Sequence, residues 1–342
     1  MVKISPPLVV EVTRGRLVES EHCIDAVIAD ASGAVLAAYG ADDRPVFPRS
    51  SIKALQALPF VESGAPGAFG LEQRHVALAC ASHWAEPMHL AGVGEMLAAA
   101  GLGPHCLECG AQSPTLKVDQ DRLVLEGRQP AAIHNCCSGK HAAFLCLAVR
   151  EGLETRGYVG FEHPVQRAVA AALTQVTGAP HDAGNRGVDG CSIPTYAIPL
   201  RNLAFAFARF GVGQDPGPER ARAMIRIRDA CLAFPELTAG TAAFGARLMR
   251  VTQGAVFAKD GAEGMFVGAI PALGAGFALK VRDGAGRAAE IAAARIVESL
   301  LELEQTQAKA LKGLAQAPVR NRRDEAVGLV RLAGPAGFAA TS

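Results

Sequence analysis

Lysine is scarce in this sequence. Its 342 residues include 8 lysines against 26 arginines. An ammonium group can lose its proton when it is desolvated, whereas a guanidinium group keeps its charge in proteins. Each lysine that falls inside a motif is therefore a candidate for chemistry that needs a neutral amine.

An excess of charge of either sign is also lacking. The 34 basic and 33 acidic residues leave a formal charge of +1, whereas proteins built for nucleic acids or anionic membranes usually carry a basic excess. We therefore expect neither partner. No charge-free apolar run reaches about 18 residues, so no transmembrane helix is predicted. The first residues, from Met1 to Pro7, show no signal-peptide pattern.

The nine cysteines do not form a disulfide pattern. Their number is odd, and Cys80 and Cys146 stand in apolar runs. This usage is typical of reduced thiols and predicts a cytoplasmic protein. A single C-x-x-C, at Cys106 and Cys109, has no second pair at zinc-ribbon spacing and is interpreted as structural.

Strand patterns lie at both ends of the chain and helix patterns between them. Apolar strand-like runs occur at 8–12, 25–30, 34–39, 255–258, 265–270 and 276–281, and helical patterns occur at 50–57, 87–100, 138–151, 164–176, 199–210, 218–234 and 288–304. We expect an α+β fold (an α/β sandwich), with an antiparallel sheet from the terminal strands, flanked by helices, and an inserted helical region. The prediction is one domain over 1–342, with the sheet at about 8–45 and 250–312 and the helical, site-bearing region at about 46–249. The polar segment beyond about residue 317 is expected to be loosely held.

The first candidate site is a serine and a lysine at the start of a helix. Ser50 and Lys53 follow Pro48 at a spacing of three, which places both side chains on one helical face. A desolvated amine there can take the serine proton. The alternative is a capping serine with an exposed lysine one turn later.

The second candidate is the segment around the single tryptophan. An apolar run at 76–81 is predicted to be a strand that leads into Ser82 and His83, before a helix that starts after Glu86. Polar groups at the end of a buried strand are common in functional sites. The alternative is a serine that caps the turn.

The third candidate is the segment 134–141, which holds Cys136, Cys137, Lys140 and two histidines and opens a helix. It is not a phosphate loop, because the upstream glycine is missing and His141 replaces the Ser or Thr. A thiolate at a helix N-terminus has a lowered pKa. Nucleophile, metal ligand and buried apolar thiol remain open for these cysteines.

Two further segments carry polar residues in tight loops. Asp189 and Cys191 lie in a glycine- and proline-rich stretch at 187–194, where they line a pocket or Asp189 binds its own turn. Lys259 is expected at the end of a strand, with a turn lysine beside Asp260 as the alternative.

Taken in order, these motifs resemble the Rhizobium etli-type (class 3) L-asparaginase family. The landmarks are Arg49-Ser50 with Lys53, Cys80-Ala81-Ser82-His83, Cys137-Ser138-Gly139-Lys140-His141, Asp189-Gly190-Cys191 and Lys259 with Gly261-Ala262. The resemblance implies a fold similar to serine β-lactamases and glutaminases, a homodimer, and hydrolysis of L-asparagine to L-aspartate and ammonia.

The resemblance also implies roles for individual residues. The catalytic groups are two Ser-Lys pairs, Ser50 with Lys53 and Ser82 with Lys259, and zinc is bound by Cys137, Lys140, Cys191 and a water. The substrate-binding residues are expected to be Arg49, whose guanidinium suits a carboxylate, together with His83 and Asp189. His141 and Asp189 are expected to orient the zinc ligands.

The sequence departs from the family at Cys136, where asparagine is usual; here Asn135 stands one place earlier. Cys136 can compete for metal or oxidise with Cys137. Two alternatives therefore stay open. One is a Ser-Lys amidase acting on glutamine or a β-lactam, and the other is a non-enzymatic zinc-binding or redox-sensing protein with Cys136, Cys137 and Cys191 as sensor thiols.

Overall fold

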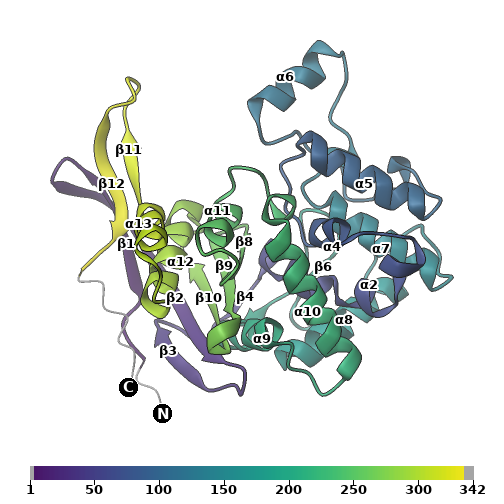
Figure 1. The fold of residues 1–342 in the computed structure, drawn as a ribbon, viewed down its shortest axis with the longest axis horizontal. Helices are drawn as coiled ribbons and strands as arrows, with labels where there is room; N and C mark the ends of the chain where they lie inside the picture. The colour runs from purple at the N-terminus through teal and green to yellow at the C-terminus, as the bar shows by residue number, and fades with distance from the viewer. Residues whose placement is uncertain (1–3, 335–342) are drawn as a thin grey trace. The chain divides into compact units, whose positions relative to one another are not determined.

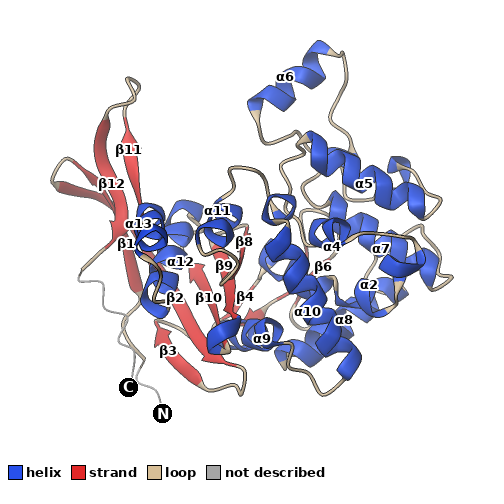
Figure 2. Ribbon diagram, in the orientation of Figure 1, coloured by secondary structure: helices blue, strands red, loops and turns tan. Residues whose placement is uncertain are grey.

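The computed structural model describes residues 4–334, which form two compact units. The sheet unit comprises 4–51, 198–214 and 248–334, and the helical unit comprises 52–197 and 215–247. The antiparallel sheet and the many helices confirm the predicted α+β fold class (Figures 1 and 2). Residues 198–214, which we expected in the helical region, belong to the sheet unit.

The sheet unit is built on eight antiparallel strands. Their order is β11-β12-β1-β2-β10-β9-β8, and β3 pairs with β2. The first hairpin therefore joins the last strands through β2 and β10, with Asp30 opposite Ala275 and Ile24 opposite Val281. The strands are β1 (Leu8–Arg14), β2 (Leu17–Asp30), β3 (Val35–Tyr39), β8 (Phe257–Gly261), β9 (Met265–Ile270), β10 (Ala275–Val281), β11 (Gln316–Arg320) and β12 (Ala326–Leu332). A separate short pair joins β4 (Pro45–Val46) to β7 (Ile198–Pro199).

Helix α9 (Leu200–Val212) packs directly on the centre of the sheet. A Cβ at Gly276 of β10 would lie 2.4 Å from the carbonyl oxygen of Ala204 and 2.2 Å from the nitrogen of Ala208. Only a glycine allows this close approach of helix and strand. The contact explains why this helix, from the middle of the sequence, belongs with strands from its two ends.

The helices α12 (Gly286–Leu300) and α13 (Gln305–Leu314) follow β10 and contact the sheet through β12 and β11. The next residues do not follow our prediction, because 316–320 and 326–332 are strands and not a loosely held segment. The polar run at 320–325 misled the prediction. Strand β11 alternates exposed and half-buried residues, as an outer strand does. Residues 335–342 lie outside the described part of the chain.

The helical unit contains ten helices in its described residues and one small hairpin. The helices are α1 (Lys53–Gln56), α2 (Leu58–Glu62), α3 (Ala65–Ala68), α4 (Gln73–Ala79), α5 (Pro87–Ala99), α6 (Lys117–Leu125), α7 (Ser138–Arg150), α8 (Pro164–Thr177) and α10 (Pro218–Ala233), and the N-terminal half of α11 (Phe244–Val251). The hairpin pairs β5 (Arg186–Val188) with β6 (Pro194–Tyr196). None of the helices described here is both long and apolar enough to span a bilayer.

The segment before Ser82 is a helix, α4, and the predicted strand at 76–81 is wrong. Glu72 and His75 form a capping box, in which the Glu72 N–H donates to His75 Nδ1 at 3.0 Å. Residues 76–79 are completely buried. A short apolar run buried on all sides has no periodicity that separates strand from helix, so the pattern could not decide.

Candidate active site

Lys53 and Ser82 form the core of the candidate site in the helical unit. Lys53 is fully buried at the start of α1. Its Nζ donates to the Ala81 carbonyl at 2.5 Å and to Ser82 Oγ at 3.0 Å. The structure thus brings Lys53 to Ser82, a contact that the sequence analysis did not predict.

The backbone around Ser82 is held from two sides. The Ser82 and Trp84 N–H groups donate to the carbonyls of Thr238 and Ala239 at 2.9 Å. Between them, the His83 N–H donates to the Cys136 carbonyl at 3.0 Å. These alternating bonds fix the segment and connect Ser82 to the cysteine motif.

The His83 ring is buried and engaged at both nitrogens. Its Nε2 lies 2.8 Å from Ser138 Oγ, and its Nδ1 accepts from the Ala85 N–H at 3.1 Å. The ring stacks on His89 with 5.1 Å between centroids. Burial holds the pKa of His83 well below its ordinary value, so the imidazole is neutral. Since both nitrogens bind protein atoms, the substrate-binding role of His83 stays a prediction that this geometry does not favour.

The three predicted zinc ligands come together in the helical unit. The Cys191 thiol donates to Cys137, and Lys140 Nζ donates to Cys191 Sγ at 3.2 Å. Cys136 Sγ lies 3.8 Å from Cys137 Sγ. Cys137, Lys140 and Cys191 are each at most 5% exposed. Residues separated by more than 50 positions therefore form one buried cluster.

The charges in this cluster follow from its contacts. Hydrogen bonds from Cys136 and Cys191 hold the pKa of Cys137 well below its usual value, so that it is the thiolate. The bond to Cys137, together with burial, raises the pKa of Cys191. Burial lowers the pKa of Lys140, but Cys191, Cys137 and Asp189 together raise it above its usual value. These contacts favour an ammonium at Lys140 beside a thiolate at Cys137.

The donor set of this cluster fits zinc. Among the described residues, no group of three or more His, Cys, Asp and Glu side chains is arranged to hold a metal ion. Two thiolates and the amine of Lys140 give three donors, and water would complete a tetrahedron. Zinc binding would have to displace protons from both Cys191 and Lys140, because each ligand must be deprotonated.

Asp189 and His141 lie beside the cluster in different ways. Asp189 accepts from the Gly190 N–H at 2.8 Å and belongs to the turn that carries Cys191. His141 is fully buried, and its Nδ1 is 2.7 Å from the Tyr158 hydroxyl, while its Nε2 has no partner. Burial holds the pKa of His141 well below its usual value. A role for either residue in orienting the ligands stays a prediction.

Left-handed backbone conformations flank the predicted site residues. Arg49, Ala85 and Ser192 have φ of 53°, 60° and 74°. Arg49 precedes Ser50, Ala85 lies two residues after His83, and Ser192 follows Cys191. A non-glycine residue with such a φ costs of order 1–3 kcal/mol, and such residues cluster at functional sites. Sequence analysis gives no signal for this strain.

Ser50 and Lys259 belong to the sheet unit. A Cβ at Gly261, at the end of β8, would lie 2.7 Å from the Pro48 carbonyl oxygen and 3.0 Å from the Ser51 nitrogen. The turn that carries Ser50 therefore lies against the strand that carries Lys259. Lys259 is 1% exposed, and its Nζ pairs with Asp260 Oδ1 at 3.0 Å.

Cys109 serves the structure of the site. Its thiol donates to the Ala132 carbonyl, and its own carbonyl accepts from Asn135 Nδ2 at 2.9 Å. Burial raises its pKa to about 12. The structural interpretation of this cysteine agrees with these contacts, and Cys106 makes no contact with the cluster described above.

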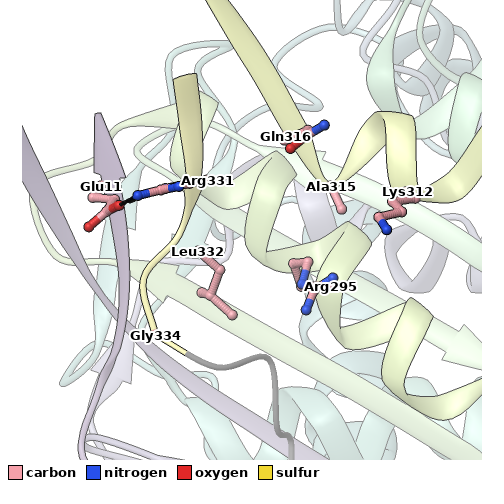
Figure 3. A pocket seen from close by; sticks show the side chains of 8 residues that line it. All are labelled: Glu11, Arg295, Lys312, Ala315, Gln316, Arg331, Leu332 and Gly334. Carbon is pink, nitrogen blue, oxygen red and sulfur yellow. Dashed lines mark hydrogen bonds and ion pairs between the residues drawn. The ribbon is translucent and has the colours of Figure 1, made fainter. Parts of the chain in front are cut away.

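A pocket of about 350 Å³ in the sheet unit contains none of the predicted site residues. Figure 3 shows that Arg331 turns toward Glu11, with which it pairs at 2.6 Å, and away from Arg295 and Lys312. The cationic side chains that line this pocket therefore do not converge on one point.

The sequence analysis missed Ser138, Tyr158 and Thr238 as supports of the site. Ser138 lies inside a recognised motif, but its hydroxyl gave no signal of its own. Tyr158 and Thr238 lie in segments without any motif, and only the folded chain brings them to the site.

The comparisons with known proteins agree with these motifs. The model of the L-asparaginase II family matches residues 10–332. The search of curated protein sequences gives no match. Solved structures similar to this one include D-alanine carboxypeptidase AmpC from Burkholderia cenocepacia, with 11% identity, 85% of this chain and 93% of that chain covered, and a TM-score of 0.38. They also include Mglu in 4.3 M NaCl, with 14% identity, 76% and 56% covered, and a TM-score of 0.33. Because the family match extends over nearly the whole chain, this protein belongs to the L-asparaginase II family.

Proposed function

We propose that this protein hydrolyses L-asparagine to L-aspartate and ammonia. Membership of the L-asparaginase II family supports an amidohydrolase. The observation that carries the chemistry is the hydrogen bond of 3.0 Å between Nζ of the buried Lys53 and Oγ of the half-buried Ser82. A serine hydroxyl beside a buried amine is the arrangement that serine nucleophiles use when no histidine base is present.

In this proposal Lys53, in its neutral form, takes the Ser82 proton as Ser82 Oγ attacks the side-chain amide carbon. The proton then passes to the departing nitrogen, which leaves as ammonia, and an acyl-enzyme remains. Water hydrolyses the ester and returns L-aspartate and the free hydroxyl. The Ala81 carbonyl fixes the amine during these steps, because it accepts a second hydrogen bond from it.

Ser50 and Lys259 form the second proposed set of catalytic groups. They lie on adjacent segments of the sheet unit. The pairings implied by the family resemblance, Ser50 with Lys53 and Ser82 with Lys259, remain proposals beside the contact between Lys53 and Ser82. Arg49 is proposed to bind the substrate carboxylate.

Zinc is proposed at Cys137, Lys140 and Cys191, whose donor chemistry fits the ion. Bound zinc would supply a Lewis acid that polarises or positions the substrate. The His83 N–H bond to the Cys136 carbonyl connects this centre to the segment that carries Ser82. A homodimer and a cytoplasmic location remain predictions from the sequence.

The decisive experiment measures ammonia release from L-asparagine and, separately, from L-glutamine, with zinc added. We expect release from asparagine, and Ser82→Ala should lower kcat by at least about a hundredfold. Ser63→Ala is the matched control, because Ser63 also donates to a carbonyl, that of Phe60, away from the site. No release from asparagine by the wild-type protein would refute the proposal, and release from glutamine alone would replace it with a glutaminase.

A further inference from the structure

Ser138 is a fully buried serine that the proposed chemistry does not use. It is the first residue of α7 and follows the proposed zinc ligand Cys137. Its hydroxyl does not cap the helix. Instead, Ser138 Oγ donates to the Ile133 carbonyl at 2.8 Å and lies 2.8 Å from His83 Nε2.

These two contacts determine where the imidazole proton lies. A hydroxyl has a single hydrogen, and Ser138 donates it to the Ile133 carbonyl. Toward His83 the Ser138 oxygen is therefore an acceptor, and Nε2 must carry the hydrogen. Nδ1 is then unprotonated and can accept the Ala85 N–H at 3.1 Å. One neutral tautomer satisfies all of these bonds.

The orientation of this ring reaches Ser82 through the backbone. His83 is 1% exposed, and its N–H is bound to the Cys136 carbonyl. Both bonds from His83 therefore end on the segment 136–138, which carries Cys137. His83 directly follows Ser82 in the chain, so the bonds that hold the His83 backbone and ring also restrain the peptide bond at Ser82.

We propose that Ser138 is a positioning residue, which accepts a hydrogen bond from His83 Nε2–H and thereby holds the backbone at Ser82 in place beside Lys53. Its kinetic consequence rests on the proposed asparaginase activity. The hydrogen bonds of the Ser138 hydroxyl go to Ile133 and His83, so its hydrogen-bonded connection to Ser82 runs through His83. The alternative is a serine that only satisfies its own buried hydroxyl.

The first test is spectroscopic and needs no substrate. In ¹⁵N-labelled full-length protein, the ring-nitrogen shifts of His83 should show protonated Nε2 and unprotonated Nδ1. Ser138→Ala removes the acceptor of the Nε2 hydrogen. The Ala85 N–H still requires an unprotonated Nδ1, so we expect the same tautomer with an Nε2–H signal that has lost its hydrogen-bonded shift. Ser138→Thr keeps a hydroxyl and should restore the wild-type Nε2–H signal. A wild-type Nδ1–H tautomer, or unchanged shifts in Ser138→Ala, would overturn the proposal.

The second test separates positioning from stability. Ser138→Ala should lower kcat for asparagine about tenfold, the equivalent of one buried hydrogen bond, with KM changed less than twofold. Ser63→Ala should leave both unchanged. Equal losses in the two variants, or a loss in KM alone, would refute a positioning role. If the wild-type protein releases no ammonia, the proposed function fails. The ring-nitrogen signals of His83 in the wild-type protein and in Ser138→Ala still decide the role of Ser138.

Discussion

Replacing Lys53 by methionine separates its chemical role from its structural one. Methionine has a similar unbranched length, so it fills the buried channel of the lysine stem without a large cavity. The change removes both hydrogen bonds that Lys53 Nζ donates, to the Ala81 carbonyl and to Ser82 Oγ. It also removes a fully buried amine that makes no ion pair with the described residues.

The expected effects differ in size. The unpaired Ala81 carbonyl costs about 1–3 kcal/mol of stability, and burial of an apolar thioether in place of a polar amine offsets part of this. Loss of a positioned base lowers the rate by about 10²–10⁴-fold, equivalent to about 3–5 kcal/mol of activation free energy. Catalysis should therefore collapse while the protein stays folded.

The assay is kcat for ammonia release, measured beside the free energy of unfolding from urea titration. Lys309→Met is the control, since Lys309 is exposed on α13 in the sheet unit. Lys53→Arg keeps the charge and should lose as much activity, because a guanidinium cannot act as a base. A folded Lys53→Met variant with kcat within about threefold of wild type would refute the assignment of Lys53 as the base.

Three other predictions follow from packing, titration and metal binding. Gly139→Ala should destabilise the protein by about 1–3 kcal/mol, because its Cβ would lie 2.3 Å from the Leu78 carbonyl oxygen. Gly94 lies in α5 with open space around it, so Gly94→Ala should stabilise the protein by about 0.5–1 kcal/mol. Urea titrations that rank the stabilities of the two variants in the opposite order contradict this description of the packing. Burial keeps the pKa of His83 and His141 below that of the unfolded chain. Below about pH 6.5 the unfolded state therefore binds more protons, so the unfolding free energy should fall from pH 7 to pH 5. A constant or rising unfolding free energy over this range contradicts the prediction. Cys191→Ser should lower the zinc bound per chain, measured by elemental analysis after dialysis. Cys146→Ser is the control and should not lower it, since the Cys146 thiol donates to the Met96 carbonyl elsewhere in the unit. Equal zinc content in both variants contradicts the ligand assignment.

Sequence periodicity located most elements but failed where burial is uniform. The helices that begin at Pro87, Pro164 and Pro218 start at the predicted residue, because proline at the first turn is a local signal. Residues 76–79 gave no such signal, since they are completely buried. The strands β11 and β12 were missed for another reason, because the polar turn between them, 321–325, dominates the composition of that segment.

The site residues were predictable in identity but not in pairing. Spacing suggested Ser50 for Lys53, since three positions along a helix bring two side chains onto one face. The structure instead gives Lys53 a contact with Ser82, 29 positions away. The proposed ligands Lys140 and Cys191 are 51 positions apart. Such contacts depend on packing between elements, which no local pattern records.

The order of the strands also has a consequence for synthesis of the chain. Strand β2 ends at Asp30, and its central neighbour β10 begins at Ala275. While the ribosome makes the intervening residues, at about 5–20 residues per second, the first hairpin keeps both outer edges without their partners, which are β10 beside β2 and β12 beside β1. The nascent chain therefore exposes an aggregation-prone edge for roughly ten seconds or more. Chaperone dependence during expression should be relieved in a circular permutant that places β8–β10 next to β1–β3.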